Sequence, residues 1–424
     1  MLTLKLIKEN PDLVIERLAV KNFDAKEIVG QVIAVSNRKN EIQKELDESK
    51  AEMNSLSREI GKLFQQGKSQ EAEAAKARTS ELKNNIKDLE QEFVSKDAEL
   101  LQLVVLLPNI PCELVPPGKT ADDNVVVATG GNMPELFDGA LCHWDLAAKY
   151  DIIDFELGVK ITGAGFPVYK GKGARLQRAL INFFLDQARD AGYLEIQPPY
   201  VVNEDSGFGT GQLPDKEGQM YQATLDNLYL IPTAEVPVTN IYRDVILDYK
   251  DLPIKNTAYS ACFRREAGSY GKDVRGLNRL HQFDKVEIVQ IAHPSKSYEV
   301  LDQMVAHVSS LVEKLGLPYR IVRLCGGDIS FTSALTYDFE VFSAAQEKWL
   351  EVSSVSNFES FQANRLKLRY REEGDRKVVL AHTLNGSALA LPRIVASILE
   401  NYQTPEGIRV PEVLIPYCGF DLIN

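Results

Sequence analysis

Cationic side chains crowd one short stretch of this 424-residue chain, FRREAGSYGKDVRGLNRLHQFDKVEIV, which covers residues 263–289. Within its residues 264–279, five cations are interrupted by three glycines, which suggests a mobile basic loop between two strands. The cations are Arg264, Arg265, Lys272, Arg275 and Arg279. Arginine binds phosphate or carboxylate through two parallel hydrogen bonds. The chain has no GxxxxGK[ST] loop, so a bound nucleotide triphosphate must be held by side-chain cations and metal.

Carboxylates interleave with these cations. Glu266 follows Arg264 by two residues. Glu287 follows Phe283 by four residues, and both spacings place side chains on one face of a strand. We expect one shared floor, where carboxylates meet an ammonium, arginines meet phosphate and Phe283 stacks on a base. Such a floor suits a zwitterionic substrate beside a triphosphate. The alternative is a solvated hairpin with surface charges, because acids and cations alternate along it.

The same stretch carries a family resemblance. FRRE followed by RLHQFDKVE resembles motif 2 (about 263–289) of the class II aminoacyl-tRNA synthetases, and EAGSYG, RGL and HQFDKVE resemble the serine-specific family. Residues 175–201, with Gly192-Tyr193 and Pro199, resemble motif 1, which forms the dimer interface of the class. TLNGSALALPRI resembles motif 3 (about 383–403), and IPTAEVP resembles the loop that receives the amino acid. The resemblance covers essentially the whole chain.

The resemblance implies the activity. Serine and ATP would give seryl-adenylate and pyrophosphate, and the seryl group would then pass to the 3′-terminal ribose of tRNA(Ser), and of tRNA(Sec) as well. ATP, L-serine and a second copy of the chain are therefore the expected partners, with Mg²⁺ accompanying ATP. A pocket built to pair a hydroxyl rejects alanine strongly, because the pocket's own polar groups would be left unsatisfied.

The resemblance also implies a serine site. Thr233 and Glu235 would receive the serine ammonium, and Glu287 with Ser387 would hydrogen-bond the serine hydroxyl. The full set implied for serine is Thr233, Ala234, Glu235, Arg264, Glu287, Asn385 and Ser387.

An ATP site follows in the same way. Arg264 would hold the α-phosphate and the serine carboxylate, Arg275 the γ-phosphate, and Glu266 the adenine amino group. The adenine would lie between Phe283 and Arg393. The full set is Arg264, Arg265, Glu266, Arg275, Phe283, Glu351, Val352, Ser353, Ser354 and Arg393, with Glu351 and Ser354 holding Mg²⁺ and with Arg264, Arg275 and Arg393 as the catalytic residues. Hard oxygen ligands suit Mg²⁺.

Two patterns depart from known motifs. The class-wide motif 3 has alternating glycines ahead of its arginine, whereas Ala388, Ala390 and Pro392 stand at all but one of these positions. HPSKS (293–297) is superficially similar to the KMSKS loop of class I synthetases, but it has no HIGH partner and more simply opens a helix. Five cysteines without a CxxC pair, and histidines without HxxH or HxxxH spacing, indicate neither disulfides nor zinc.

A helical region precedes these motifs. Residues 28–106 contain no proline and are rich in Glu, Lys, Gln, Ala and Leu, with apolar residues in two heptad series on either side of FQQGKSQ. The series are Ile42, Leu46, Met53, Leu56, Ile60, Leu63 and Ala72, Ala75, Thr79, Leu82, Ile86, Leu89, Phe93. This pattern predicts an antiparallel coiled-coil hairpin with arms about 50 Å long.

The hairpin alone has a simpler reading, as a structural or dimerisation coiled coil. Arg58, Lys62 and Lys68 would give its tip a basic end that could meet a phosphate backbone. The family resemblance implies a tRNA-binding arm. Because the chain has a net charge of −12, any RNA site must be local.

The remaining chain lacks regular βαβ alternation and a GxGxxG opening, which favours an α+β fold on a mainly antiparallel sheet. We expect an N-terminal domain at 1–107, a proline-rich linker at 108–124 and a class II catalytic domain at 125–424. No signal peptide or membrane span is indicated, so we expect a cytoplasmic protein. Two alternatives are a ligase that loads a carrier protein, which should lack the long arm, and a coiled-coil interaction protein with a decayed catalytic domain, which should have lost Arg264, Glu266, Glu287, Glu351 or Arg393.

Overall fold

The computed structural model describes residues 1–267, 274–374 and 377–424, which divide into two compact units. The first unit comprises Met1–Ala19 and Phe23–Pro108, and the second comprises Val20–Asn22 and Asn109–Asn424. The expected domain limits at 107 and 124 stay predictions. No helix among the described residues is long and apolar enough to cross a membrane.

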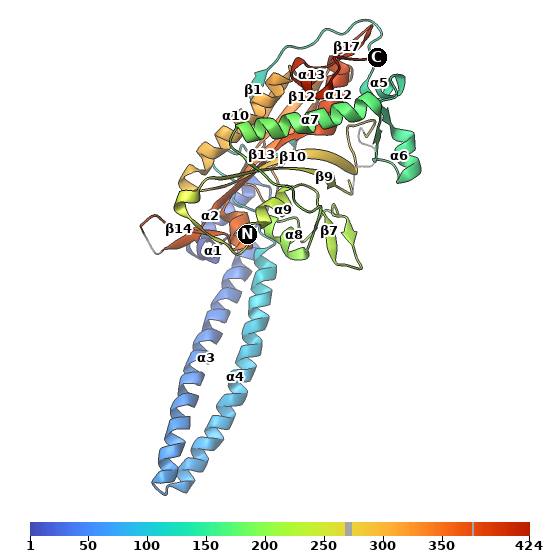
Figure 1. The fold of residues 1–424 in the computed structure, drawn as a ribbon. Coiled ribbons are helices and arrows are strands. Elements are labelled where there is room, and N and C mark those ends of the chain that lie inside the picture. Colours follow the sequence, from blue (N-terminus) through green and yellow to red (C-terminus); the bar gives the residue numbers. More distant parts are fainter. Residues whose placement is uncertain (268–273, 375–376) are drawn as a thin grey trace. The chain divides into compact units, whose positions relative to one another are not determined.

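The first unit is helical. Its elements are α1 (Leu4–Glu9), α2 (Pro11–Val20), α3 (Lys26–Gln65) and α4 (Ser69–Val104). The long helices α3 and α4 lie side by side as an antiparallel hairpin (Figure 1). Gly67 allows the turn between them, because its φ of 73° is a left-handed conformation that glycine adopts without strain. The predicted hairpin is confirmed.

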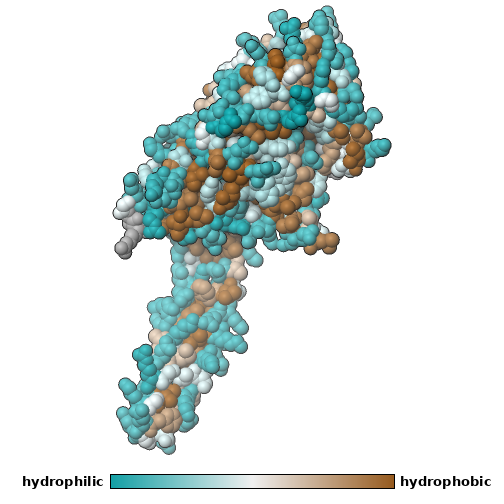
Figure 2. Space-filling view, viewed as in Figure 1, coloured by the Kyte–Doolittle hydropathy of each residue, from teal (hydrophilic) through white to brown (hydrophobic). Residues whose placement is uncertain are grey.

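A narrow apolar seam joins the two long helices. Ile42 and Leu46 of α3 pack with Ile86 and Leu89 of α4. The polar seam residue Ser49 accepts a hydrogen bond from Asn85. The outer surface is mainly hydrophilic, with apolar residues between the charged ones (Figure 2). Ion pairs cross between the helices at Arg38–Glu92, Arg78–Glu52 and Lys50–Glu90.

The second unit is built on an eight-stranded sheet in the order β1-β11-β12-β13-β16-β10-β9-β4. The strands are β1 (Val125–Gly130), β4 (Leu194–Glu195), β9 (Ile254–Phe263), β10 (Gln282–Ala292), β11 (Tyr319–Arg323), β12 (Leu335–Ser343), β13 (Lys348–Glu359) and β16 (His382–Ala390). All pairings are antiparallel except that of β4 with β9. The expected α+β fold is confirmed.

Helices α7 (Gly171–Asp190), α10 (Ser297–Lys314) and α12 (Leu391–Asn401) pack against this sheet (Figure 1). Leu180, Met304 and Val395, one from each helix, are buried in the main core with sheet residues. The remaining short helices are α5 (His143–Lys149), α6 (Phe155–Ile161), α8 (Glu204–Thr210), α9 (Glu235–Asn240), α11 (Ser360–Leu366) and α13 (Ile415–Cys418).

Short strands form four small sheets beside the large one. They are β2 (Ile153–Asp154) with β3 (Val168–Tyr169); β5 (Val201–Val202), β7 (Leu228–Leu230) and β6 (Gln222–Ala223); β8 (Ile246–Asp248), β14 (Arg369–Arg371) and β15 (Val378–Leu380); and β17 (Gln403–Thr404), β18 (Gly407–Arg409) and β19 (Leu422–Ile423).

Helix α7 begins at Gly171, and α12 begins at Leu391. Pro392 is tolerated in α12 because the first turn of a helix has no intrahelical partner for the missing N–H. Arg393 therefore lies in the first turn of α12.

Candidate active site

The centre of the site is the middle of β10, between β9 and β16. Glu287 lies opposite Ala258 of β9 and Ser387 of β16. Two residues further along β10, Val289 lies opposite Asn385. The predicted pair of Glu287 and Ser387 is therefore adjacent across two strands. The pairing of β10 with β16 is irregular between Lys285 and Glu287, where the register of the two strands shifts.

The Glu287 carboxylate is buried, with two partners on one oxygen. Its residue is only 1% exposed. Lys285 Nζ lies 2.6 Å from Oε2, and the Thr233 hydroxyl donates to Oε2 over 2.9 Å. A buried ion pair with an additional hydrogen bond holds the carboxylate in one orientation.

Glu235 is the second buried acid of the site. Gln362 Nε2 donates to its Oε1 over 2.7 Å, and the Thr233 hydroxyl accepts from its backbone N–H over 3.2 Å. Burial, together with the neighbouring Glu287 carboxylate, raises the pKa of Glu235 to about 7, although the Gln362 hydrogen bond opposes the rise. Ala234, immediately before it, is fully buried.

Three residues of this cluster do not appear in the predicted site. Lys285 pairs with Glu287, and Gln362 bridges Glu235 to the hydroxyl of Thr383, which donates to Gln362 Oε1 over 2.7 Å. Lys285 stands two residues before Glu287, so the strand period places both on one face of β10. For Gln362 the sequence carries no such signal, since it lies on α11, far from the motifs.

Arg264 and Phe283 lie together at the start of the loop. The guanidinium of Arg264 is 5.3 Å from the centre of the Phe283 ring, a cation–π distance. Its Nε also donates to the carbonyl of Pro232, just before Thr233. Arg265 instead faces Tyr221, 5.9 Å from its ring centre, and lines a cavity of about 520 Å³ with residues that include Phe208 and Gln222.

The strand-spacing argument for Arg264 and Glu266 is wrong. β9 ends at Phe263, so both residues lie in the loop, and Glu266 has a φ of 50°. Its carboxylate pairs with Arg279 at 2.7 Å. The predicted cation Lys272 lies outside the described residues.

Arg275 lies apart from the other cations. Its guanidinium is 4.6 Å from the centre of a ring of Trp144, and Nη2 is 3.7 Å from Asp145 on the same helix, α5. It is about two-thirds exposed. The described contacts of Arg275 therefore join the loop to α5.

Arg393 connects three segments of the site from the first turn of α12. Its Nε donates to the carbonyl of Asn278 over 3.0 Å, and its Nη1 donates to the carbonyl of Glu351 over 2.7 Å. The carboxylate of Glu351 is 3.6 Å away. Arg393 thus holds the end of the loop next to β13.

The predicted metal residues lie on β13. Ser354 faces Asp338 and Glu351 faces Glu340 across the β12–β13 ladder. Asp338 has a buried oxygen without a hydrogen-bond partner. Burial and the nearby Glu351 raise the pKa of Asp338 well above its usual range, against the effect of the Ser354 hydroxyl.

Between these two positions, Val352 and Ser353 are buried, and the Ser353 hydroxyl donates to the carbonyl of Ser387. Within the described part of the chain, no group of three or more His, Cys, Asp or Glu side chains could hold a metal ion. A cation here would depend on few protein ligands.

Comparisons with known proteins match the N-terminal part, the C-terminal part and the whole length of the chain to related proteins. The family described as "Seryl-tRNA synthetase N-terminal domain" matches residues 1–111, and the "tRNA synthetase class II core domain (G, H, P, S and T)" matches residues 219–402. A serine-tRNA ligase of Salinibacter ruber is 51% identical over 100% of this chain and 99% of the relative.

Solved structures are similar as well. Seryl-tRNA synthetase from Pyrococcus horikoshii, complexed with ATP, is 33% identical with a TM-score of 0.94, covering 100% of this chain and 99% of that one. Cytoplasmic serine-tRNA ligase from Naegleria fowleri, in complex with AMP, is 28% identical with a TM-score of 0.89 over the same shares.

Proposed function

The chain belongs to the seryl-tRNA synthetase family, and we propose how its residues divide the work of that reaction. The chain is a serine-tRNA ligase. The serine carboxylate attacks the α-phosphate of ATP, and pyrophosphate leaves. A hydroxyl of the 3′-terminal ribose of tRNA then attacks the acyl carbon of seryl-adenylate, and AMP leaves.

The serine pocket is the buried cluster around Glu287. The single observation that carries this proposal is the hydrogen bond from Thr233 to Glu287, because it joins the amino-acid loop to the strand that faces Ser387. Glu287 and Ser387 pair with the serine hydroxyl, and Thr233 and Glu235 receive its ammonium. Ala234 and Asn385 complete the pocket.

This arrangement favours serine over alanine. Alanine would leave buried polar groups without a partner, and a site that pairs a hydroxyl can reject such an analogue by about 10⁴ or more. The test is pyrophosphate exchange with serine, threonine, alanine and cysteine. We expect exchange with serine alone, and exchange that prefers another of these amino acids would contradict the proposed pocket.

The ATP site uses the loop and α12. Arg264 holds the α-phosphate and the serine carboxylate, and its Nε contact with Pro232 brings the guanidinium close to the amino-acid loop. Arg275 reaches the γ-phosphate from the exposed position beside Trp144, and Arg265 supports the phosphates. Catalysis then consists of positioning and charge neutralisation, without a covalent nucleophile on the protein.

Adenine recognition uses three side chains of the same region. Phe283 and Arg393 enclose the adenine, and Glu266 accepts from the adenine amino group. The ring of Phe283 already attracts the Arg264 guanidinium, which supports its use as a flat surface for a base.

Mg²⁺ fits the residues of β13. Glu351 and Ser354 offer hard oxygen atoms, and the unpartnered oxygen of Asp338 opposite Ser354 suits a nearby cation. Glu351 and Ser354 would hold the ion, with Val352 and Ser353 shaping the strand between them. When bound, Mg²⁺ neutralises phosphate charge, and few protein ligands suffice because Mg²⁺ usually shares phosphate oxygens.

The α3–α4 hairpin is proposed as the arm that binds tRNA(Ser), and tRNA(Sec) as a second substrate. Arg58, Lys62 and Lys68 are exposed near its turn, where they could contact phosphates. Removing residues 42–93 and closing the gap with a short turn should abolish tRNA charging but spare serine-dependent pyrophosphate exchange. Unchanged charging would refute the arm's role, whereas loss of exchange would point to misfolding.

A homodimer is proposed, and besides the motif 1 region (175–201) it would use the edge strand β1. Its Val125, Val126 and Val127 are between 38% and 48% exposed, although an apolar sheet edge usually needs a cover. A second copy of the chain supplies that cover. We further propose that the reaction takes place in the cytoplasm.

A further inference from the structure

A buried histidine outside the motifs used above and a buried glutamate of motif 3 that has no role assigned so far both connect to the ATP loop. His143 opens α5 and Glu400 lies near the end of α12, and both are completely buried. His143 Nδ1 is 2.7 Å from Glu400 Oε1, and its backbone N–H donates to the same oxygen over 2.9 Å.

The other ring nitrogen defines the protonation pattern. The backbone N–H of Leu277 donates to His143 Nε2 over 2.9 Å, so Nε2 must be unprotonated. Nδ1 then carries the proton and donates to Glu400. Burial alone would raise the pKa of Glu400, but hydrogen bonds from His143 and Ser343 outweigh it and lower the pKa. A neutral histidine therefore joins an ionised glutamate to a loop amide.

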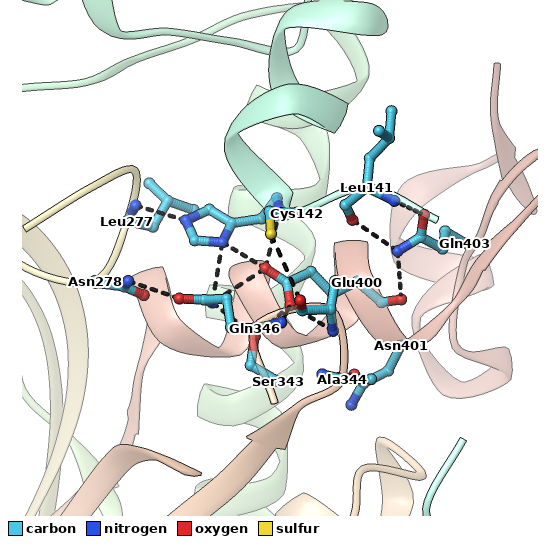
Figure 3. Close-up of polar contacts among 12 residues, drawn as sticks. Leu141, Cys142, Leu277, Asn278, Ser343, Ala344, Gln346, Glu400, Asn401 and Gln403 are labelled. Atoms are coloured by element: carbon cyan, nitrogen blue, oxygen red, sulfur yellow. Dashed lines mark hydrogen bonds and ion pairs between the residues drawn. The ribbon is translucent and has the colours of Figure 1, made fainter. Parts of the chain in front are cut away.

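A second branch starts from the same carboxylate. Glu400 Oε2 accepts from the Ser343 hydroxyl and from the backbone N–H groups of Ala345 and Gln346, which fixes the β12–β13 turn. Gln346 Oε1 in turn accepts from Asn278 Nδ2 over 2.8 Å (Figure 3). The two branches thus hold Leu277 and Asn278, neighbours in the loop.

These two residues lie between the proposed ATP ligands. Gly276 packs so closely on the imidazole that a Cβ would collide with Nε2. Arg275 stacks on Trp144, the residue after His143. The carbonyl of Asn278 accepts from Arg393. The hydrogen bonds that hold Leu277 and Asn278 therefore also limit the positions of Arg275 and Arg393.

We propose that His143 and Glu400 are positioning residues for ATP, which hold the C-terminal part of the loop so that Arg275 and Arg393 meet the nucleotide in one arrangement. Neither side chain touches substrate. Serine, whose proposed pocket is built on Thr233 and Glu287, should be insensitive to the pair. The inference rests on the proposed ATP roles of Arg275 and Arg393.

The test is steady-state pyrophosphate exchange with the full chain, varying ATP and serine separately. His143→Asn keeps an amide donor for Glu400 but offers Leu277 no acceptor, and we expect the KM for ATP to rise about tenfold, as for one lost hydrogen bond. The KM for serine should stay within about twofold. His143→Gln places an amide oxygen near the position of Nε2 and should restore much of the ATP affinity.

Glu400→Gln should exceed His143→Asn in its effect on ATP, because an amide NH₂ in place of Oε2 opposes the donors of the β12–β13 turn and disturbs both branches. The matched control is Asn401→Ala. Asn401 ties the same end of α12 to the same turn, through Phe342 and Ala344, without contacting the loop. It should lower the melting temperature and leave both KM values unchanged.

Melting temperatures identify variants that fail to fold. An unchanged KM for ATP in folded His143→Asn would overturn the proposal, and so would an equal rise in Asn401→Ala or in the KM for serine. Arg275→Ala and Arg393→Ala test the proposed ATP roles separately from the positioning role of His143 and Glu400. If these two leave the KM for ATP unchanged, the proposed ATP roles fail, whatever the His143 variants do.

Discussion

Two carboxylates in one pocket differ because their partners differ. Glu287 is neutralised by Lys285 at 2.6 Å, whereas Glu235 has an uncharged amide partner, Gln362. A buried carboxylate without a cation favours its protonated form, which explains the rise in the pKa of Glu235 to about 7. The pocket therefore holds one acid paired with a cation and a second acid, Glu235, whose ionised form an arriving cation would favour.

Serine binding should therefore depend on pH. An ammonium prefers ionised Glu235, which is the minor form below pH 7, so the KM for serine should rise by up to about tenfold per pH unit as pH falls below 7. Pyrophosphate exchange between pH 5.5 and 8.5 measures this. A serine KM that is flat across this range, with the fold intact by circular dichroism, would contradict the assignment.

The Glu235 carboxyl group affects folding stability with the opposite pH dependence, because its protonated form favours the folded state. Folded Glu235 binds more protons than unfolded Glu235 between pH 4.5 and about 7. Its contribution to the free energy of unfolding is thus fully present below pH 4.5 and is lost as pH rises through about 7. In Glu235→Gln the free energy of unfolding, measured without serine, should lose this part of its pH dependence.

The hydroxyl of Thr233 offers a second residue-scale test. Thr233→Val keeps the shape but removes the donor to Glu287, and we expect the KM for serine to rise about tenfold while the KM for ATP changes little. Thr257→Val is the matched control, because the Thr257 hydroxyl donates to the backbone carbonyl of Glu287, not to its carboxylate. A similar rise in both variants would attribute the effect to packing.

At the scale of elements, sequence patterns predicted the structure where one period dominates. The heptad series gave the α3–α4 hairpin, including the turn at Gly67, and the alternation of Phe283, Lys285 and Glu287 follows a real strand. The Arg264–Glu266 spacing failed because β9 ends at Phe263. Gln362 and His143 reach the site only through tertiary contacts, and no local pattern encodes those. The roles of the site residues stay predictions.

The hairpin seam can be tested without touching the site. Ile42→Ala opens a cavity in the seam and should cost about 2–5 kcal/mol of local stability. Faster amide hydrogen exchange confined to α3 and α4 is the expected signal, with normal pyrophosphate exchange. The exposed Lys44→Ala is the control, since its ion pair with Glu48 is worth about 0.5 kcal/mol or less. Equal rates of amide hydrogen exchange in the two variants would contradict a stabilising role of the seam.

At the scale of the whole molecule, the proposed dimer would use the edge strand β1 of the eight-stranded sheet. Val126→Asp introduces a charge on β1, where the native side chain is 48% exposed, and should shift a dimer towards monomer because burying an unpaired carboxylate is costly. Sedimentation velocity measures the shift. Val159→Asp, at an exposed valine of α6, should leave the sedimentation coefficient unchanged. A dimer that persists in Val126→Asp would show that β1 is not part of the dimer interface.

The stacking of Arg275 on Trp144 gives the protein an intrinsic optical reporter. The chain has only two tryptophans, and the other, Trp349, lies against Phe342 and Arg320. In Trp349→Phe all indole emission comes from Trp144, whose face carries a cation until that cation turns to a phosphate. Titrating this variant with ATP should change the emission spectrum, and AMP, which has no γ-phosphate, should not. Triphosphate binding could then be followed by the intrinsic fluorescence of Trp144, without an attached dye.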